Sequence, residues 1–197
     1  MASSTSSSLL SFQRFVLEPL KLLRQRPAYA LQALYQGREE KTTRAIGITS
    51  HADPAALRDA LARHDFDCTQ MALNAGLAKM ADSPAGMKAT PLGPDSFENL
   101  ALPVATRKNL GVIAMKVFGQ EQLLGAAPFD QLLAYALSLP VSLGSVGMPK
   151  LEHIEHNASV ARAFRPLSKN RREHLRKSIQ DSRKLALARF LQDHRDI

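Results

Sequence analysis

The chain has 197 residues, of which 45% are hydrophobic and 22% charged, a composition typical of one globular domain with a buried core and not of a disordered chain. Its single cysteine, Cys68, excludes an internal disulfide and favours a reducing compartment, so we expect a cytoplasmic protein. No apolar stretch approaches the roughly 18 to 20 residues that cross a bilayer, so a membrane is not an expected partner. The net charge is +8, but the basic segments lack the interleaved aromatic residues and glycines of nucleic-acid binders, so nucleic acid is not an expected partner either.

The N-terminal segment, residues 1–27, is rich in serine and then basic. Its first eight residues have almost no apolar side chains to bury and are expected to be disordered, with a helical stretch after them. Three interpretations stay open. The segment is an organelle transit peptide, or a frayed tail ahead of an amphipathic helix, or the result of a reading frame that begins at an internal start codon. The helix of the second interpretation would be built on Leu17, Leu20, Leu22 and Leu23.

From residue 28 onward, helical patterns alternate with short β-branched apolar runs, which is typical of βα units around a parallel sheet. A helix over residues 29–36 leads through a charged turn into a buried strand at 44–49. Asp53 and Pro54 supply an N-cap and a proline at the first helical position, which predicts a helix over 55–63. A second strand covers 66–73.

The pattern continues after a loop rich in Gly, Pro, Ser and Asp, from about residue 76 to 96, which is longer than most connections and is typical of a functional or mobile segment. The next predicted elements are a helix over 97–108, a strand over 111–117, a helix over 129–139, a strand over 141–146 and a helix over 151–164. A basic amphipathic helix over about 169–192 closes the chain within the segment 166–197. A solvated helical face explains its charge.

These elements predict an α/β fold with four parallel strands near residues 43–49, 66–73, 110–117 and 141–146. The strands should lie in sequential order, because right-handed βα crossovers connect adjacent parallel strands. Four βα units are half of an eight-stranded (β/α)8 barrel, so a partial TIM barrel over residues 28–165 is the expected architecture.

The four strands, in this order and spacing, resemble the fifth to eighth strands of the aldo/keto reductase family. The fifth resembles Arg44 to His51, and the sixth resembles Asp67 to Asn74 with the spacing Gln70-x-x-x-Asn74. The seventh resembles Gly111 to Gly119, and the eighth strand with its helix resembles Val146 to Asn157. The resemblance implies an oxidoreductase that reduces aldehydes or ketones with NADPH.

The resemblance also implies a cofactor site at the carboxyl ends of the strands, where parallel barrels bind ligands. Thr49, Ser50 and Gln70 stand where the family holds the nicotinamide carboxamide. The resemblance implies that one loop covers the nicotinamide and the pyrophosphate, formed by Met115, Lys116, Val117, Phe118 and Gly119. It also implies that the adenosine end of the cofactor is received by Gly147, Met148, His153, His156 and Asn157.

The cofactor implied is NADP, with NAD as an open alternative. Many family members place a stacking aromatic where Met115 stands, and a basic residue plus serine where Gly147 and Met148 stand. Lys150 or the histidines would have to supply the charge that holds a 2′-phosphate.

Each assignment has a structural alternative. Thr49 and Ser50 could cap the turn before Asp53, Gln70 could satisfy backbone groups, and Met115 could be core filler. His153 and His156 lie three apart on one helix without a third ligand at suitable spacing, so no metal site is expected and a solvated helix face is favoured.

The family's Asp, Tyr, Lys and His catalytic set has no match before residue 43, and we interpret Tyr29 and Tyr35 as packing residues. No residue is therefore assigned as catalytic, and the chain is expected to be inactive alone. It would be a gene-model fragment, a relic, or a half that associates with another copy or a complementary half-barrel through open sheet edges. The alternative function is a non-catalytic binding or assembly module that uses those edges or the basic C-terminal helix. A third interpretation, an organelle-targeted nucleic-acid-binding protein, rests on charge alone.

Overall fold

The computed structural model describes residues 27–81, 88–91 and 93–193. The expected disorder of residues 1–8 lies outside these residues. The described part divides at Ile46 into two compact units. In the first unit, helix α2 (Pro27–Glu39) matches the helix predicted over 29–36 and ends in a turn where Thr42 Oγ1 donates to Gly37 O at 2.9 Å.

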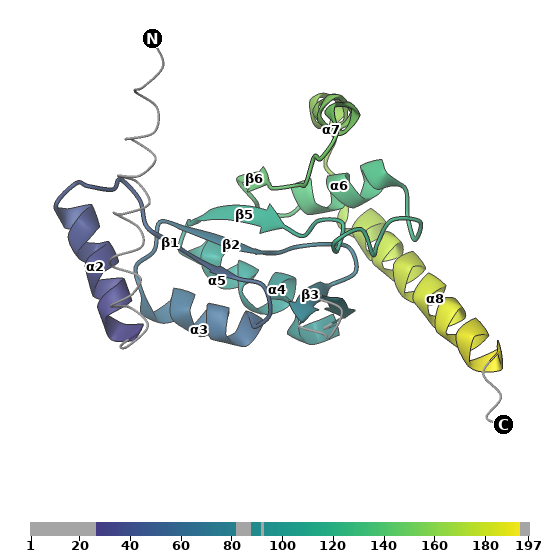
Figure 1. The fold of residues 1–197 in the computed structure, drawn as a ribbon, viewed down its shortest axis with the longest axis horizontal. Helices are drawn as coiled ribbons and strands as arrows, with labels where there is room; N and C mark the ends of the chain where they lie inside the picture. The colour runs from purple at the N-terminus through teal and green to yellow at the C-terminus, as the bar shows by residue number, and fades with distance from the viewer. Residues whose placement is uncertain (1–26, 82–87, 92, 194–197) are drawn as a thin grey trace, which may run out of the picture. The chain divides into compact units, whose positions relative to one another are not determined.

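The second unit is built on a four-stranded parallel sheet in the order β1-β2-β5-β6 (Figure 1). The strands are β1 (Gly47–Ser50), β2 (Cys68–Ala72), β5 (Gly111–Met115) and β6 (Leu143–Gly144). All three pairings are parallel, which confirms the predicted topology. Each strand is shorter than predicted. The strand β6 keeps two residues of the expected 141–146, since Val141 N donates to Leu139 O at 2.7 Å in a tight turn before it.

Helices cover one face of the sheet, the face on which Met71, Val112 and Ala114 are at most 1% exposed. Figure 1 shows α3 (Pro54–Arg63) and α5 (Leu102–Arg107) below the strands. The predicted start of α3 is confirmed, because the Asp53 side chain accepts from Ala56 N at 2.9 Å and Pro54 occupies the first turn. The third helix on the sheet, α6 (Phe129–Leu137), lies beside β6.

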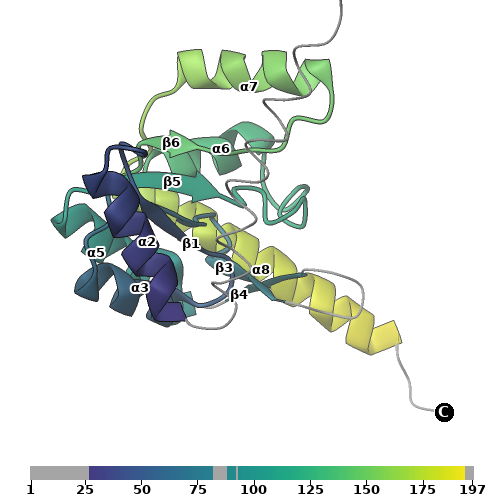
Figure 2. The ribbon, with the colours of Figure 1, turned by 60° about the vertical axis from the view of Figure 1, so that its left-hand side comes forward.

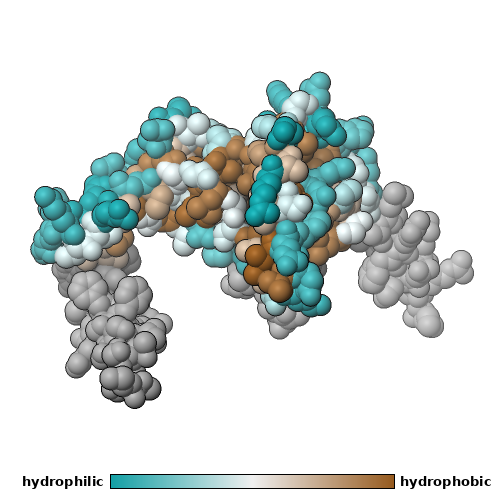
Figure 3. All heavy atoms as spheres, turned by 90° about the horizontal axis from the view of Figure 1, so that it is seen from above, coloured by the Kyte–Doolittle hydropathy of each residue, from teal (hydrophilic) through white to brown (hydrophobic). Residues whose placement is uncertain are grey.

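Among the described residues from Gly47 onward, no helix covers the opposite face of the sheet. Paired residues in parallel strands point to the same face, so Thr49, Gln70, Ile113 and Leu143 share this side. Thr49 is exposed, Gln70 and Ile113 are half-buried, and Leu143 is 48% exposed. Figure 3 looks onto this side and shows apolar surface over its middle. We call this side the open face. In a closed barrel it would be the interior.

The segment predicted as a loop over 76–96 contains an antiparallel hairpin, β3 (Ala78–Ala81) with β4 (Lys88–Pro91), and a 3-10 turn, η1 (Gly93–Asp95). The buried Asn74 fixes its start, because its amide accepts from Ala78 N and donates to Ala78 O, both at 3.0 Å. Met80 N then donates to His51 O at 2.8 Å, which ties the hairpin to the end of β1.

The helix predicted over 97–108 is two helices, α4 (Phe97–Leu100) and α5, with Ala101 between them. Pro103 explains the break, because a proline lacks the N–H of a helix interior and is tolerated in a first turn. Ser96 caps α4 by accepting from Asn99 N at 3.3 Å.

Two further helices, α7 (Leu151–Ala163) and α8 (Lys169–Asp193), follow β6 as predicted. Figures 1 and 2 both place α7 beside α6 and farther from β1 and β2. The described part of α8 buries Leu175 and Ile179. Its partly buried Arg172 donates from Nη1 to Ser138 O and Leu167 O, at 3.0 and 3.1 Å, so this face of α8 is packed and not solvated.

A polar triad joins three helices. The phenol of Tyr135 on α6 donates to Glu98 Oε2 on α4 at 2.7 Å, and Arg176 Nη1 on α8 donates to Glu98 Oε1 at 3.2 Å. Tyr135 is fully buried. Burial, and then the Glu98 carboxylate, raise the pKa of Tyr135 well above its ordinary value of 10.0.

The raised pKa predicts a specific loss of stability in alkali. Below about pH 10 the phenol is neutral in both states and its contribution is complete, whereas above pH 10 only the unfolded chain ionises it, so stability falls by up to about 1.4 kcal/mol per pH unit. Urea unfolding at pH 8, 10 and 11 should show the difference in unfolding free energy between the parent and Tyr135→Phe shrinking as pH rises. A difference that stays constant with pH would contradict this.

Candidate functional site

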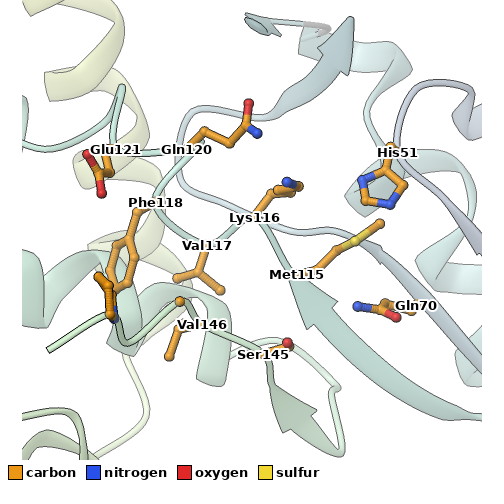
Figure 4. Close-up of a pocket in the computed structure, with 12 residues that line it drawn as sticks. His51, Gln70, Met115, Lys116, Val117, Phe118, Gln120, Glu121, Ser145 and Val146 are labelled. Carbon is orange, nitrogen blue, oxygen red and sulfur yellow. The ribbon is translucent and has the colours of Figure 1, made fainter. Parts of the chain in front are cut away.

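A cavity of about 390 Å³ lies at the carboxyl ends of all four strands (Figure 4). Its lining comes from the residue after β1, from β2, from the end of β5 with the loop that follows, and from the segment after β6. The lining residues are His51, Gln70, Met115, Lys116, Val117, Phe118, Gln120, Glu121, Ser145, Val146, Gly147 and Pro149. This is the end of a parallel sheet at which ligands bind.

The loop after β5 has an unusual backbone. Lys116, Gly119, Gln120 and Glu121 all have left-handed φ angles, of 56°, 55°, 53° and 69°. Left-handed conformations of residues other than glycine cost on the order of 1 kcal/mol or more each, so packing must hold them. The fully buried Leu123 anchors the loop, with its N–H donating to Phe118 O at 3.2 Å. Strain of this kind clusters at ligand-binding segments.

Aromatic contacts connect the loop with two helices. The Phe118 ring stacks on Phe129 of α6 at 4.4 Å between centroids, and Phe129 meets the ring of His156 on α7 edge-on at 5.0 Å. His156 Nε2 also lies 2.8 Å from Asp130 Oδ1. The sequence favoured a solvated helix face for His156, and its ring is half-exposed with two partners on α6.

The cavity brings together six of the thirteen residues predicted for the cofactor. These are Gln70, Met115, Lys116, Val117, Phe118 and Gly147. Gly119 is buried within the same loop, whereas Met148 and His153 are exposed outside the lining.

The strand-end residues Thr49 and Ser50 do not line the cavity. Thr49 pairs with Gln70 and lies exposed on the open face. Ser50 lies on the helix-covered side, where its Oγ accepts from Asp53 N and donates to Asp53 O, both at 3.2 Å. This is the turn-capping role left open for it in the sequence. Its assignment to the carboxamide therefore stays a prediction without a contact to support it.

Two of the described side chains contain buried polar atoms without a hydrogen-bond partner, His51 at Nδ1 and Asn157 at both amide atoms. Asn157 is 7% exposed on the otherwise exposed helix α7. Buried polar groups are nearly always paired, so both side chains have hydrogen-bonding groups that the described residues leave unsatisfied. An adenine ring offers a donor and an acceptor of the kind that an amide pairs with, but Asn157 does not line the cavity, so its role at the adenosine end stays a prediction.

The sequence did not assign His51, Gln120, Glu121, Ser145, Val146 or Pro149 to the site. Ser145 and Val146 end the strand predicted over 141–146, and the other four lie two to four residues after a predicted strand, so nearness to a strand end was the available signal. The titratable lining groups have mixed charge, with Lys116 basic and Glu121 acidic. Within the described residues, no cluster of three or more His, Cys, Asp or Glu side chains is placed to hold a metal ion. The described helices include none long and apolar enough to span a membrane.

Solved structures match this architecture. The aldo-keto reductase AKR11C1 from Bacillus halodurans matches in its apo form with a TM-score of 0.54 and 15% identity, over 78% of this chain and 57% of that chain. Its holo form matches with a TM-score of 0.52 and 16% identity, over 75% and 54%.

The chain therefore has an aldo-keto reductase-like fold. The thermostable aldo-keto reductase Tm1743, in a complex with the inhibitor epalrestat, matches with a TM-score of 0.51 and 19% identity, over 75% of this chain and 53% of that one. The chain thus spans little more than half the length of these aldo-keto reductases. No family model and no curated protein matches the sequence. At these identities the likeness establishes the partial-barrel fold alone.

Proposed function

We propose that this chain binds a nicotinamide cofactor, NADP, at the carboxyl end of its sheet, as the cofactor-holding half of an aldo/keto reductase-type oxidoreductase of the cytoplasm. The observation that carries the proposal is the strand-end cavity, in which Gln70, Met115 to Phe118 and Gly147 lie together although they come from three separate parts of the sequence. When bound, NADPH supplies the hydride for a carbonyl carbon.

The lining residues have the chemistry to hold such a ligand. The Gln70 amide both donates and accepts, as a carboxamide requires of its partner. The ammonium of Lys116 provides positive charge for a diphosphate. Met115 and Val117 present apolar surface to a flat ring, and the buried loop residues exclude water beneath it.

The adenosine end of the ligand is proposed to lie along the start of α7. Gly147 and Pro149 line the cavity just before this helix begins at Leu151. Lys150 and His153 lie in the same region and would provide the charge for a 2′-phosphate. This charge is the basis for proposing NADP over NAD.

Asn157 offers a test in which stability and binding should change in opposite directions. Asn157→Leu removes two buried polar atoms that lack partners, so the fold should gain about 1 kcal/mol or more. The same change removes the hydrogen bonds proposed for the adenine, so NADPH should bind about tenfold more weakly. The binding is measured by NADPH fluorescence and by calorimetry, with NADH titrated in parallel, and the stability by urea unfolding.

Asn170→Leu is the matched control, since Asn170 is exposed on α8 and does not line the strand-end cavity. It should leave the Kd for NADPH unchanged. A parent chain that binds neither NADPH nor NADH would refute the proposed function, and an Asn157→Leu variant that binds as tightly as the parent would refute the role of Asn157 alone.

A further inference from the structure

We propose that two copies of this chain close one eight-stranded parallel barrel, in which β6 of each copy pairs with β1 of the other. This assembly does not depend on cofactor binding. Among the described residues from Gly47 onward, β1 pairs with β2 only and β6 pairs with β5 only, so each copy offers two strand edges. Unpaired edge amides and carbonyls favour further strand pairing.

The geometry of the sheet fits a twofold closure. The strands are all parallel and in sequential order, so a rotation of 180° about the barrel axis keeps every strand direction and creates both β6–β1 seams at once. Two sheets of four strands give eight, the number at which barrel side chains fill the interior. The matched aldo-keto reductases are nearly twice as long as the part that this chain covers. A second copy would bring the number of parallel strands to eight.

The exposed apolar residues lie where the seam would form. In the second unit, the described large apolar side chains that are exposed are Leu124, Leu143, Met148, Leu151 and Ile154. Four of these five fall between β6 and the second turn of α7. Leu143 lies on the edge strand and the other three follow it in sequence, and exposed apolar side chains gathered in one segment are typical of an interface.

The side chains of the open face lie in layers across the strands, as in a barrel interior. At its lower layer Cys68 lies between Gly47 and Gly111, and a Cβ at position 47 would lie 2.6 Å from the Cys68 sulfur. The middle layer contains Thr49, Gln70, Ile113 and Leu143. Layers contributed by neighbouring strands are the packing unit of a barrel core, and a second copy would place an equal set opposite.

The test uses Leu143, which is exposed in one copy and would be buried at the seam. The purified full chain should elute with twice the 21.6 kDa mass of one chain in size exclusion with light scattering. Leu143→Arg should reduce this to a single chain, because a charge would be buried in the barrel. The matched control is Leu124→Arg, which is 43% exposed against 48% for Leu143 and lies in the loop after β5. The control should remain a dimer.

The single cysteine provides a second readout that needs no substitution. Cys68 is half-buried on the open face, so closure should shield its thiol and slow its reaction with a disulfide reagent by about tenfold or more. Dilution below the dimer Kd should restore the faster rate. A parent chain that is monomeric would overturn the proposal, as would a dimer that survives Leu143→Arg in a folded state. A thiol whose reactivity does not change between monomer and dimer would also overturn it.

Discussion

The purified chain is expected to bind NADPH without oxidising it above background when aldehydes, ketones or quinones are added. A hydride transfer to a carbonyl leaves negative charge on the oxygen, and a positioned general acid typically contributes about 10²- to 10⁴-fold to its rate. Preorganised stabilisation of that oxyanion contributes a comparable or larger factor. We expect neither factor to be supplied, because no match for the family's Asp, Tyr, Lys and His set is expected in this sequence.

The cavity itself contains two groups that could donate a proton, His51 and Lys116. Among the described residues from Gly47 onward, no tyrosine lines it, so within this unit a tyrosine is not paired there with a lysine that lowers its pKa. Spectrophotometry of NADPH oxidation over a panel of carbonyl compounds measures the expected absence of turnover. The controls are His51→Phe, Tyr29→Phe and Tyr35→Phe. Robust turnover that disappears in one of these variants would show that this chain has its own proton donor.

Replacing Glu98 is expected to be among the most destabilising single changes outside the apolar core. Glu98→Ala removes the acceptor of both Tyr135 and Arg176, and the side chains of Glu98 and Arg176 are only 14% and 23% exposed. Breaking one partner of a largely buried ion pair costs about 3 to 5 kcal/mol, because the remaining charge is left unpaired. Urea unfolding should therefore show a loss of about 3 kcal/mol or more at pH 7.

Glu173→Ala is the control for this experiment. Glu173 also faces Arg176, but at 4.0 Å and with 49% of its side chain exposed, and exposed ion pairs contribute at most about 1 kcal/mol. The expected contrast between the two variants identifies Glu98 as the point that fixes α8 to α4 and α6. Equal losses in both variants would show that general helix charge, and not the buried contact with Tyr135, stabilises this region.

Features with a local chemical cause could be predicted from the sequence. Asp53 and Pro54 determine where α3 begins, and the β-branched runs around Ile48 and Val112 predicted the strands and their order. Pro103 also indicated the helix break, although the periodicity over 97–108 was interpreted as one helix. A segment with helical periodicity that contains a proline can therefore form two helices and not one.

Features that depend on contacts distant in sequence could not be predicted in this way. The segments of the β3–β4 hairpin, Ala78–Ala81 and Lys88–Pro91, have few β-branched residues, and the bond from Met80 N to His51 O joins positions far apart in the chain. The same holds for the candidate site. Gln70 and Met115 were placed by resemblance, but the burial of His51 Nδ1 depends on how the surrounding elements pack.

The stack of Phe118, Phe129 and His156 makes the two ends of the proposed cofactor site mechanically dependent on each other. Of the residues on α7 only Asn157 is buried, so this helix has few other contacts to hold it, and the ring stack is a main route by which its position is set. A ligand that restricts the loop at Phe118 would also restrict α7 through the ring stack. Less conformational entropy of α7 would then be lost when the adenosine end of the cofactor binds. The nicotinamide half and the adenosine half of the dinucleotide would then bind with positive cooperativity, even as two separate mononucleotides.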